Sequence, residues 1–306
     1  MSDKPALDYS NEESVLLEPE PPLPRVDFNL SGLVTLYVLT LRQFVRGKRW
    51  WIFALLFLLP AGLAVLLRAT TDDLPLRGME FILVFSLIPL GLVPLISLLY
   101  ASGIVQDELE EQTITYLLIR PLPKWGIYLG KLLATLTTTA LLVAICTSFT
   151  FIGIYAFANP PEGESIIVRC LKVDGLMALA AVAYSCLFAL ISLFTRRSLI
   201  AGICYTIILE GILGRLPFAT RLLTVAYYFR VIAARTLDFT ITEGRHRVSP
   251  IGHAWNIDIE KDPSLLEHPQ LATCFEVLVG ASIVAALIAA FLFTVKEFRV
   301  KTPEGS

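Results

Sequence analysis

Few side chains in this 306-residue sequence are of types that carry out chemistry, and their spacing predicts neither a catalytic nor a metal site. The five cysteines lack a CxxC or other metal-ligand spacing, and three stand inside apolar runs, where cysteine packs as a small hydrophobic residue. The three histidines are irregularly spaced, and no cysteine or acidic pattern completes a metal site around them. We therefore expect no metal and no cofactor on this chain. The residues are Cys146, Cys170, Cys186, Cys204 and Cys274, and His246, His253 and His268.

Glu210, in the run ICYTIILEGILGR, is the acid that falls deepest inside an apolar segment. A charge at the middle of a bilayer costs at least about 2.5–3.5 kcal/mol on insertion scales. We therefore expect its carboxyl to be neutral, paired or next to a polar cavity. Three roles stay open: a hydrogen bond to a neighbouring helix or to backbone, a place on a polar path through the membrane, and proton coupling.

The run GIYLGKLL, residues 126–133, has a superficial likeness to a phosphate-binding loop. That loop needs four residues between its glycines, and a Ser or Thr after its Lys to bind magnesium. Here three residues separate the glycines, and Leu132 follows Lys131. We expect this chain to bind no nucleotide.

The composition places these residues in an all-α, polytopic integral membrane protein. Hydrophobic residues make up 55% of the chain and charged residues 17%, and the mean hydropathy is +0.68. The net charge of −2 and the dispersed basic residues exclude a nucleic-acid binder. Because a helix needs about 20 mostly apolar residues to cross a bilayer, six segments are candidate spans. They are residues 50–67, 81–102, 132–158, 175–195, 198–214 and 271–295, of which the fifth is the weakest.

The remaining segments complete the expected organisation. Residues 1–29 carry seven acids, two bases and five prolines, which predicts a disordered cytoplasmic tail without the pattern of a signal peptide. Residues 30–49 predict an interfacial helix with a basic end. The six-span domain covers residues 50–295, and a short cytoplasmic stub covers residues 296–306.

Lys and Arg in the short loops predict the orientation. With both termini in the cytoplasm, the inner side holds twelve basic residues and the short outer loops hold four, Arg68, Arg77, Arg169 and Lys172. The long segment 215–270 then lies outside, its first half on or in the outer surface with Arg221, Arg230 and Arg235 toward water or headgroups. Cys170 and Cys274 fall on the same outer side, which leaves a disulfide between them open.

The cytoplasmic segment at residues 104–131 is the most informative part of the sequence. Acidic residues crowd its beginning, and apolar residues recur at about helical spacing after them. Pro121 and Pro123 then stop the helix, because proline has no N–H to donate. From this pattern alone, the segment is either a solvated connector or a rigid docking helix for a cytoplasmic partner.

The order of residues in this segment resembles the coupling segment of the ABC-2-type permeases, the membrane subunits of one class of ABC exporter. Acids are followed by Thr, apolar residues, a base with Pro, another base, and Gly-Lys at the start of the next span. The matching residues are Glu108, Glu111, Thr113, Leu117, Leu118, Arg120, Pro121, Lys124, Gly130 and Lys131. The resemblance extends over most of the chain, with residues 30–48 as the interfacial "elbow" helix, the six spans and the outer segment before the last span.

The resemblance implies a permease that exports a substrate across the cell (inner) membrane, together with a second permease and separate ABC ATPase subunits. ATP and Mg would then be bound by the partner ATPase and not by this chain. Contact with the ATPase is expected at Glu108, Glu111, Thr113, Tyr116, Leu117, Arg120, Pro121 and Lys124.

Two other classes of membrane protein, enzymes and ion-coupled transporters, are alternatives to an ABC permease. An integral-membrane enzyme acting on lipid or peptide needs a cluster of catalytic groups at membrane depth, and the sequence offers one buried Glu and no buried His. An ion-coupled secondary transporter predicts interrupted helices or several ionisable residues at the midplane, which the sequence does not indicate. The substrate, and whether the permease pairs with a copy of itself, do not follow from the sequence.

Overall fold

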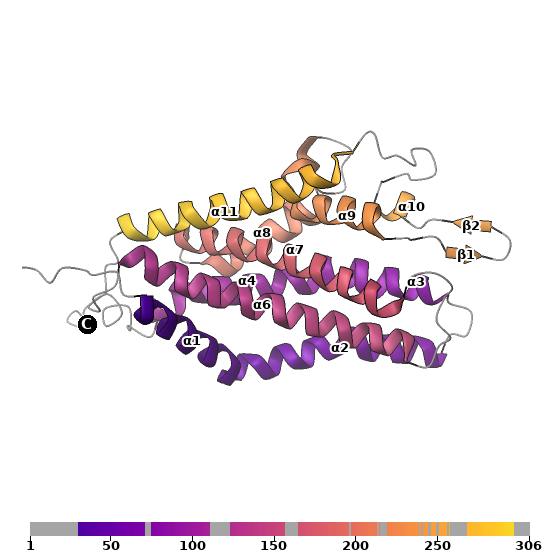
Figure 1. Cartoon of the computed structure of the whole chain (residues 1–306), viewed down its shortest axis with the longest axis horizontal. Coiled ribbons are helices and arrows are strands. Elements are labelled where there is room, and N and C mark those ends of the chain that lie inside the picture. The colour runs from indigo at the N-terminus through magenta and orange to yellow at the C-terminus, as the bar shows by residue number, and fades with distance from the viewer. Residues whose placement is uncertain are drawn as a thin grey trace, which may run out of the picture.

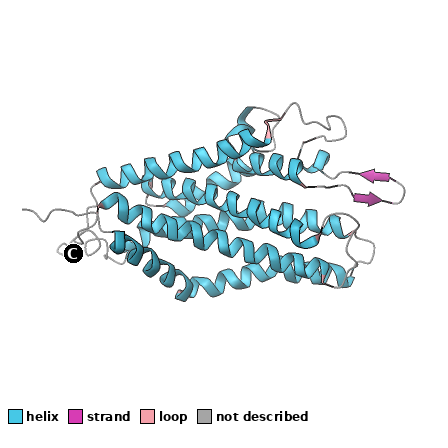
Figure 2. Cartoon of the chain, viewed as in Figure 1, coloured by secondary structure: helices cyan, strands magenta, loops and turns pink. Residues whose placement is uncertain are grey.

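The chain forms a bundle of long helices in a computed structural model, with one short β-hairpin projecting from one end (Figures 1 and 2). The structure describes residues 30–70, 75–110, 123–156, 165–195, 197–212, 214, 219–237, 239, 241–243, 246–248, 251–255, 257 and 268–296. We call the end of the bundle that holds α1 the α1 end, and the opposite end the hairpin end.

The first half of the chain contains six of the described helices. These are α1 (Leu30–Arg46), α2 (Lys48–Thr70), α3 (Leu76–Glu80), the π-helix η2 (Phe81–Leu92), α4 (Val93–Glu110) and α6 (Lys124–Tyr155). The second half contains α7 (Ile166–Phe194), α8 (Ser198–Tyr205), the π-helix η3 (Thr206–Ile212), the 3₁₀-helix η5 (Ala219–Leu223), α9 (Val225–Thr236), β1 (Ile241–Glu243), β2 (His246–Val248), α10 (Ile251–Trp255) and α11 (Leu271–Val295). The hairpin pairs Thr242 with Arg247 in an antiparallel register.

Five helices in the described residues are long and apolar enough to cross a membrane: Trp51–Thr70, Leu76–Asp107, Lys124–Tyr155, Ile166–Phe194 and Leu271–Val295. They correspond to five of the six predicted spans. The remaining one, Ser198–Ile212, is a shorter apolar helix of 15 residues. At a rise of about 1.5 Å per residue it covers roughly 22 Å, which is less than the roughly 30 Å hydrocarbon core.

The centre of the bundle is formed by α6 and α7, whose packed faces lie among the buried residues. Hydroxyl groups on α6 donate to the backbone carbonyl one turn earlier in the helix. For example, Thr138 Oγ1 donates to Ala134 O at 2.7 Å. This pairing matters in a membrane, where no water is available to satisfy a buried hydroxyl. Between the helices, Thr139 Oγ1 and Ser185 Oγ lie 3.3 Å apart.

The start of α6 packs closely on α1 because two glycines face the interface. A Cβ at Gly126 would lie 3.1 Å from Leu33 Cδ2, and one at Gly130 would lie 3.5 Å from Leu36 Cδ2. The neighbouring Lys131 is buried. Gly130, from the Gly-Lys pair predicted to open the third span, therefore also packs against the first helix.

The second long helix is continuous from α3 through η2 to α4, but its middle is a π-helix. Pro89 lies inside η2, and Pro94 is the second residue of α4. Proline removes a backbone hydrogen bond and clashes with the preceding turn of an α-helix. This helix therefore departs from α-helical geometry at η2, with Pro89 inside the π-helix and Pro94 just after it.

Candidate functional site

Most residues expected to contact an ATPase lie outside the described residues. They are Glu111, Thr113, Tyr116, Leu117, Arg120 and Pro121. Glu108 lies in α4, which runs to Glu110, and Lys124 is the exposed first residue of α6. Gln106 of α4 donates through Nε2 to Thr195 O at the end of α7, 3.4 Å away. The segment therefore starts and finishes at the α1 end of the bundle.

Glu210 lies in η3, and its carboxylate meets the beginning of α9. Oε1 accepts the N–H of Val225 at 2.9 Å, and Oε2 accepts the N–H of Ala226 at 3.1 Å. The hydroxyl of Tyr205 donates to Oε1 at 3.4 Å, and Tyr184 also hydrogen-bonds to the carboxyl. The first N–H groups of a helix have no partner in the helix, and they favour a negative charge. The carboxylate therefore supplies the acceptors that the helix start lacks.

The depth of this contact follows from its neighbour on α7. Tyr184 lies ten residues before the end of α7 at Phe194, or about 15 Å from the α1 end at the helical rise. Glu210 is thus well inside the bundle, and the residue is only 2% exposed. Of the three roles left open by the sequence, a hydrogen bond to backbone is observed, and the other two stay predictions.

The predicted fifth span is consequently interrupted at this depth. The helix Ser198–Ile212 approaches from the α1 end. The next long helix, α9, begins at Val225, whose N–H donates to the Glu210 carboxylate. Beyond α9, Phe239 packs on Phe85 with ring centroids 4.7 Å apart, next to the hairpin end. Sequence analysis missed this interruption, because residues 213–224 separate the two helices along the chain.

The helix α9 is buried on all sides, which differs from the expected surface helix. Arg230, expected toward water, is 5% exposed. Its positive charge has a small favourable electrostatic effect on the Glu210 carboxylate. Arg221 lies with its guanidinium 5.2 Å from the ring centroid of Tyr227.

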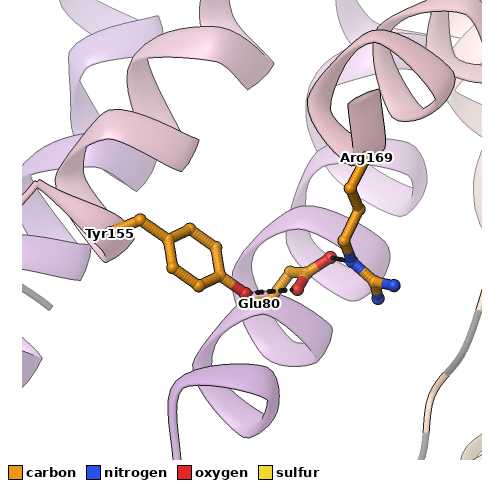
Figure 3. Close-up of polar contacts among 3 residues, drawn as sticks. All are labelled: Glu80, Tyr155 and Arg169. Carbon is orange, nitrogen blue, oxygen red and sulfur yellow. Dashed lines mark hydrogen bonds and ion pairs between the residues drawn. The ribbon is translucent and has the colours of Figure 1, made fainter. Parts of the chain in front are cut away.

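A second buried carboxylate, Glu80, joins three helices at the hairpin end (Figure 3). Arg169 of α7 pairs with it, with Nε 2.7 Å from Oε1, and Tyr155 of α6 donates its hydroxyl to Oε2 at 2.7 Å. Glu80 is 1% exposed and Arg169 is 5% exposed. The guanidinium of Arg169 also lies 5.8 Å from the ring centroid of Phe239. Sequence analysis missed this cluster, since Arg169 was placed in an outer loop and Glu80 before a span.

A third carboxylate, Asp174, lies in the helix Ile166–Phe194, so Glu210 is not the only acid within a long apolar helix. Thr147 and Ser148 of α6 both donate hydroxyl groups to it, the second at 2.9 Å. The thiol of Cys170 lies 3.6 Å from Oδ2. The predicted fourth span starts at residue 175 and leaves Asp174 just outside it, whereas α7 begins nine residues earlier, at Ile166.

The cysteines are free thiols, and His268 forms a hydrogen bond to a tyrosine. Cys170 and Cys274 are both free, which answers the open question of a disulfide. No group of three or more potential metal ligands occurs among the described residues. His268 instead lies with Nδ1 3.0 Å from the hydroxyl of Tyr227.

Comparison with known proteins adds a family to this architecture. No curated protein matches the chain. The family model described as "ABC-2 family transporter protein" matches residues 44–212, which is more than half of the sequence and includes α2 to η3. The match contains both helices that border the expected docking segment, and it contains Glu80, Asp174 and Glu210. The chain therefore belongs to the ABC-2 transporter family.

Proposed function

We propose that the chain is the permease subunit of an ABC exporter, and that it works with a second permease and with separate ABC ATPase subunits. The ABC-2 family is a family of transport proteins, and its permeases normally work with an ABC ATPase. Export as the direction, the second permease and the docking contacts are the parts of the proposal that go beyond family membership.

The proposal is supported by the position of α4 and α6, the two helices that flank the expected docking segment. The segment connects α4 to α6, and both of these helices belong to the packed centre of the bundle. A push on this segment would therefore be delivered to two long helices at once. The acids at its start and the bases at its end offer a cytoplasmic partner charges of both signs.

In the proposed cycle the ATPase binds ATP and Mg, and this chain supplies the path and the docking segment. Closure of the ATPase subunits moves residues 104–131 as a rigid body. Movement of α4 and α6 then switches the bundle between access from one side and access from the other. The α1 end is cytoplasmic in this proposal, which agrees with the predicted basic inner rim.

The interrupted fifth helix favours one competing function, an ion-coupled secondary transporter. Such transporters place helix N-termini and ionisable residues near the membrane midplane. In this chain the N-terminus of α9 is occupied by the chain's own Glu210. Dependence on ATP separates the two functions.

The test is affinity purification from mild detergent, followed by measurement of ATP hydrolysis. We expect an ABC ATPase to copurify with the wild-type chain, and the double variant Glu108→Lys/Glu111→Lys to lose at least about 90% of it. The matched control is Glu276→Lys, because Glu276 is an exposed acid in the first turns of α11, at the other end of the bundle. Retention of the ATPase by the double variant, or equal loss in the control, contradicts the docking site. Transport by the purified chain without ATP contradicts the whole proposal.

A further inference from the structure

The cluster of Glu80, Arg169 and Tyr155 has no role in the function proposed above, yet it connects three long helices at one point (Figure 3). Each oxygen of the Glu80 carboxylate has its own partner at 2.7 Å, one on α7 and one on α6. Close by, Arg68 near the end of α2 donates to Ile154 O at 2.7 Å. The helices α2, α3, α6 and α7 are therefore connected to one another at the hairpin end.

The segment that follows α9 also packs against the helices at the hairpin end. Phe239 and Trp255 pack with Phe81 and Phe85 in an aromatic cluster whose ring centroids lie 4.7–6.2 Å apart. The guanidinium of Arg169 lies next to the Phe239 ring in this cluster. The ion pair and the aromatic cluster thus share Arg169.

The helix that carries Glu80 is the one that leads to the docking segment. It runs without a break from Leu76 to Glu110, and Glu80 immediately precedes the π-helix η2. π-helices are rare, and they occur frequently at functional sites. Pro89 inside η2 removes a backbone hydrogen bond. This helix therefore has a firmly held end, a weakened middle and an end that leads to the docking segment.

A buried ion pair is either formed or broken, because a charge left without its partner in a low-dielectric interior is strongly unfavourable. Such a contact changes in one step when water enters, and it does not weaken gradually. A permease has to open and close each end of its bundle during transport. A contact with this all-or-none character is suited to holding one end shut.

We propose that Glu80, Arg169 and Tyr155 form a latch that keeps the hairpin end closed, and that movement of the docking segment opens it with η2 as the joint. Opening separates α3 from the start of α7 and the end of α6. Water then reaches Glu80 and Arg169. The opening step rests on the proposed function, whereas the closed latch does not.

The test is hydrogen–deuterium exchange of the complete complex in lipid nanodiscs, with and without ATP and vanadate. We expect nucleotide trapping to speed exchange of the backbone amides of residues 76–81 and 166–172 by at least about tenfold. The variant Arg169→Gln should show this fast exchange already without nucleotide, and Arg169→Lys should restore part of the protection. Lys172→Gln is the matched control, since Lys172 is an exposed cation less than one turn further along α7.

Tyr155→Phe provides a milder variant in case Arg169→Gln does not fold, because it removes one hydrogen bond and leaves the ion pair. It should speed exchange of the same peptides by about threefold to tenfold without nucleotide. A cluster with a purely structural role would show no dependence on nucleotide in the wild-type complex, and that result overturns the latch. If the wild-type chain brings no ATPase with it, the proposed function fails instead. The latch is then judged on the chain alone, where unchanged exchange of residues 76–81 in Arg169→Gln and Tyr155→Phe overturns it.

Discussion

Among the described residues, Glu80 and Glu210 are the two fully buried glutamates, and different groups hold them in place. Glu80 at the hairpin end is held by the side chains of Arg169 and Tyr155, which come from two other helices. Glu210, well inside the bundle, is held by the backbone N–H groups of Val225 and Ala226, with tyrosine hydroxyls as additional donors. The Glu80 contact therefore depends on side chains that move with α6 and α7. The Glu210 contact depends on the backbone at the start of α9.

This difference separates a contact that can switch from a contact that fixes the fold. Arg169 and Glu80 can part when their helices part, provided that water replaces each partner. Glu210 determines where the broken fifth helix resumes as α9, and loss of that contact would leave the first N–H groups of a buried helix without acceptors. Predictions that weaken each cluster in turn test the comparison.

The largest effect is expected for Arg169→Ala, because it leaves the Glu80 carboxylate buried without its cation. Breaking a buried pair by removing one partner costs about 3–5 kcal/mol. The double variant Glu80→Met/Arg169→Met removes both charges and should lose less than Arg169→Ala alone. Free energies of unfolding in mixed micelles measure both variants. Lys172→Ala, with its exposed side chain, should stay within about 0.5 kcal/mol of the wild type.

An additive result would contradict the description of Glu80 and Arg169 as one unit. If the double variant loses as much as the two single changes Glu80→Met and Arg169→Met together, the two side chains are energetically independent.

The next largest effect is expected at Glu210. Glu210→Ala removes both acceptors from the start of α9 and should cost about 2–3 kcal/mol, given that hydrogen bonds to charged groups contribute about 1.5–3 kcal/mol. Glu210→Gln keeps one carbonyl oxygen as an acceptor and should lose about half as much. Unfolding in the same micelles compares the two variants. Equal losses in the two variants would show that the negative charge, and not the acceptor geometry, holds α9.

The long apolar segments were predictable because hydropathy averages over a whole helix. The last helix, Leu271–Val295, has the predicted bounds, and α1 occupies most of the predicted interfacial segment at residues 30–49. The start of α7 was not predictable in this way, since its first turns carry Arg169 and Asp174. Those charges lower the hydropathy, yet each is satisfied inside the bundle by a residue on another helix.

The polar clusters could not be predicted for a related reason. Nothing in a single sequence shows that Glu80 lies opposite Arg169, or that Thr147 and Ser148 face Asp174, because their pairing depends on how the helices pack. Glu210 was identified because it interrupts an apolar run, and that signal indicates a cost without naming the partner. Its partner is a backbone segment 15 residues later in the chain, for which side-chain types give no indication.

The smallest effects separate the two clusters by their tyrosines. The Tyr155 hydroxyl lies 2.7 Å from Glu80 Oε2, whereas the Tyr205 hydroxyl lies 3.4 Å from Glu210 Oε1. Because a hydrogen bond weakens as it lengthens, Tyr155→Phe should cost about 1.5 kcal/mol and Tyr205→Phe about 0.5 kcal/mol or less. Unfolding free energies of the two single variants give the comparison directly, since each change removes one oxygen from a tyrosine. A larger loss for Tyr205→Phe would mean that Glu210 depends on its side-chain partners as Glu80 does, and the distinction between the switching and the fixed carboxylate would then be lost.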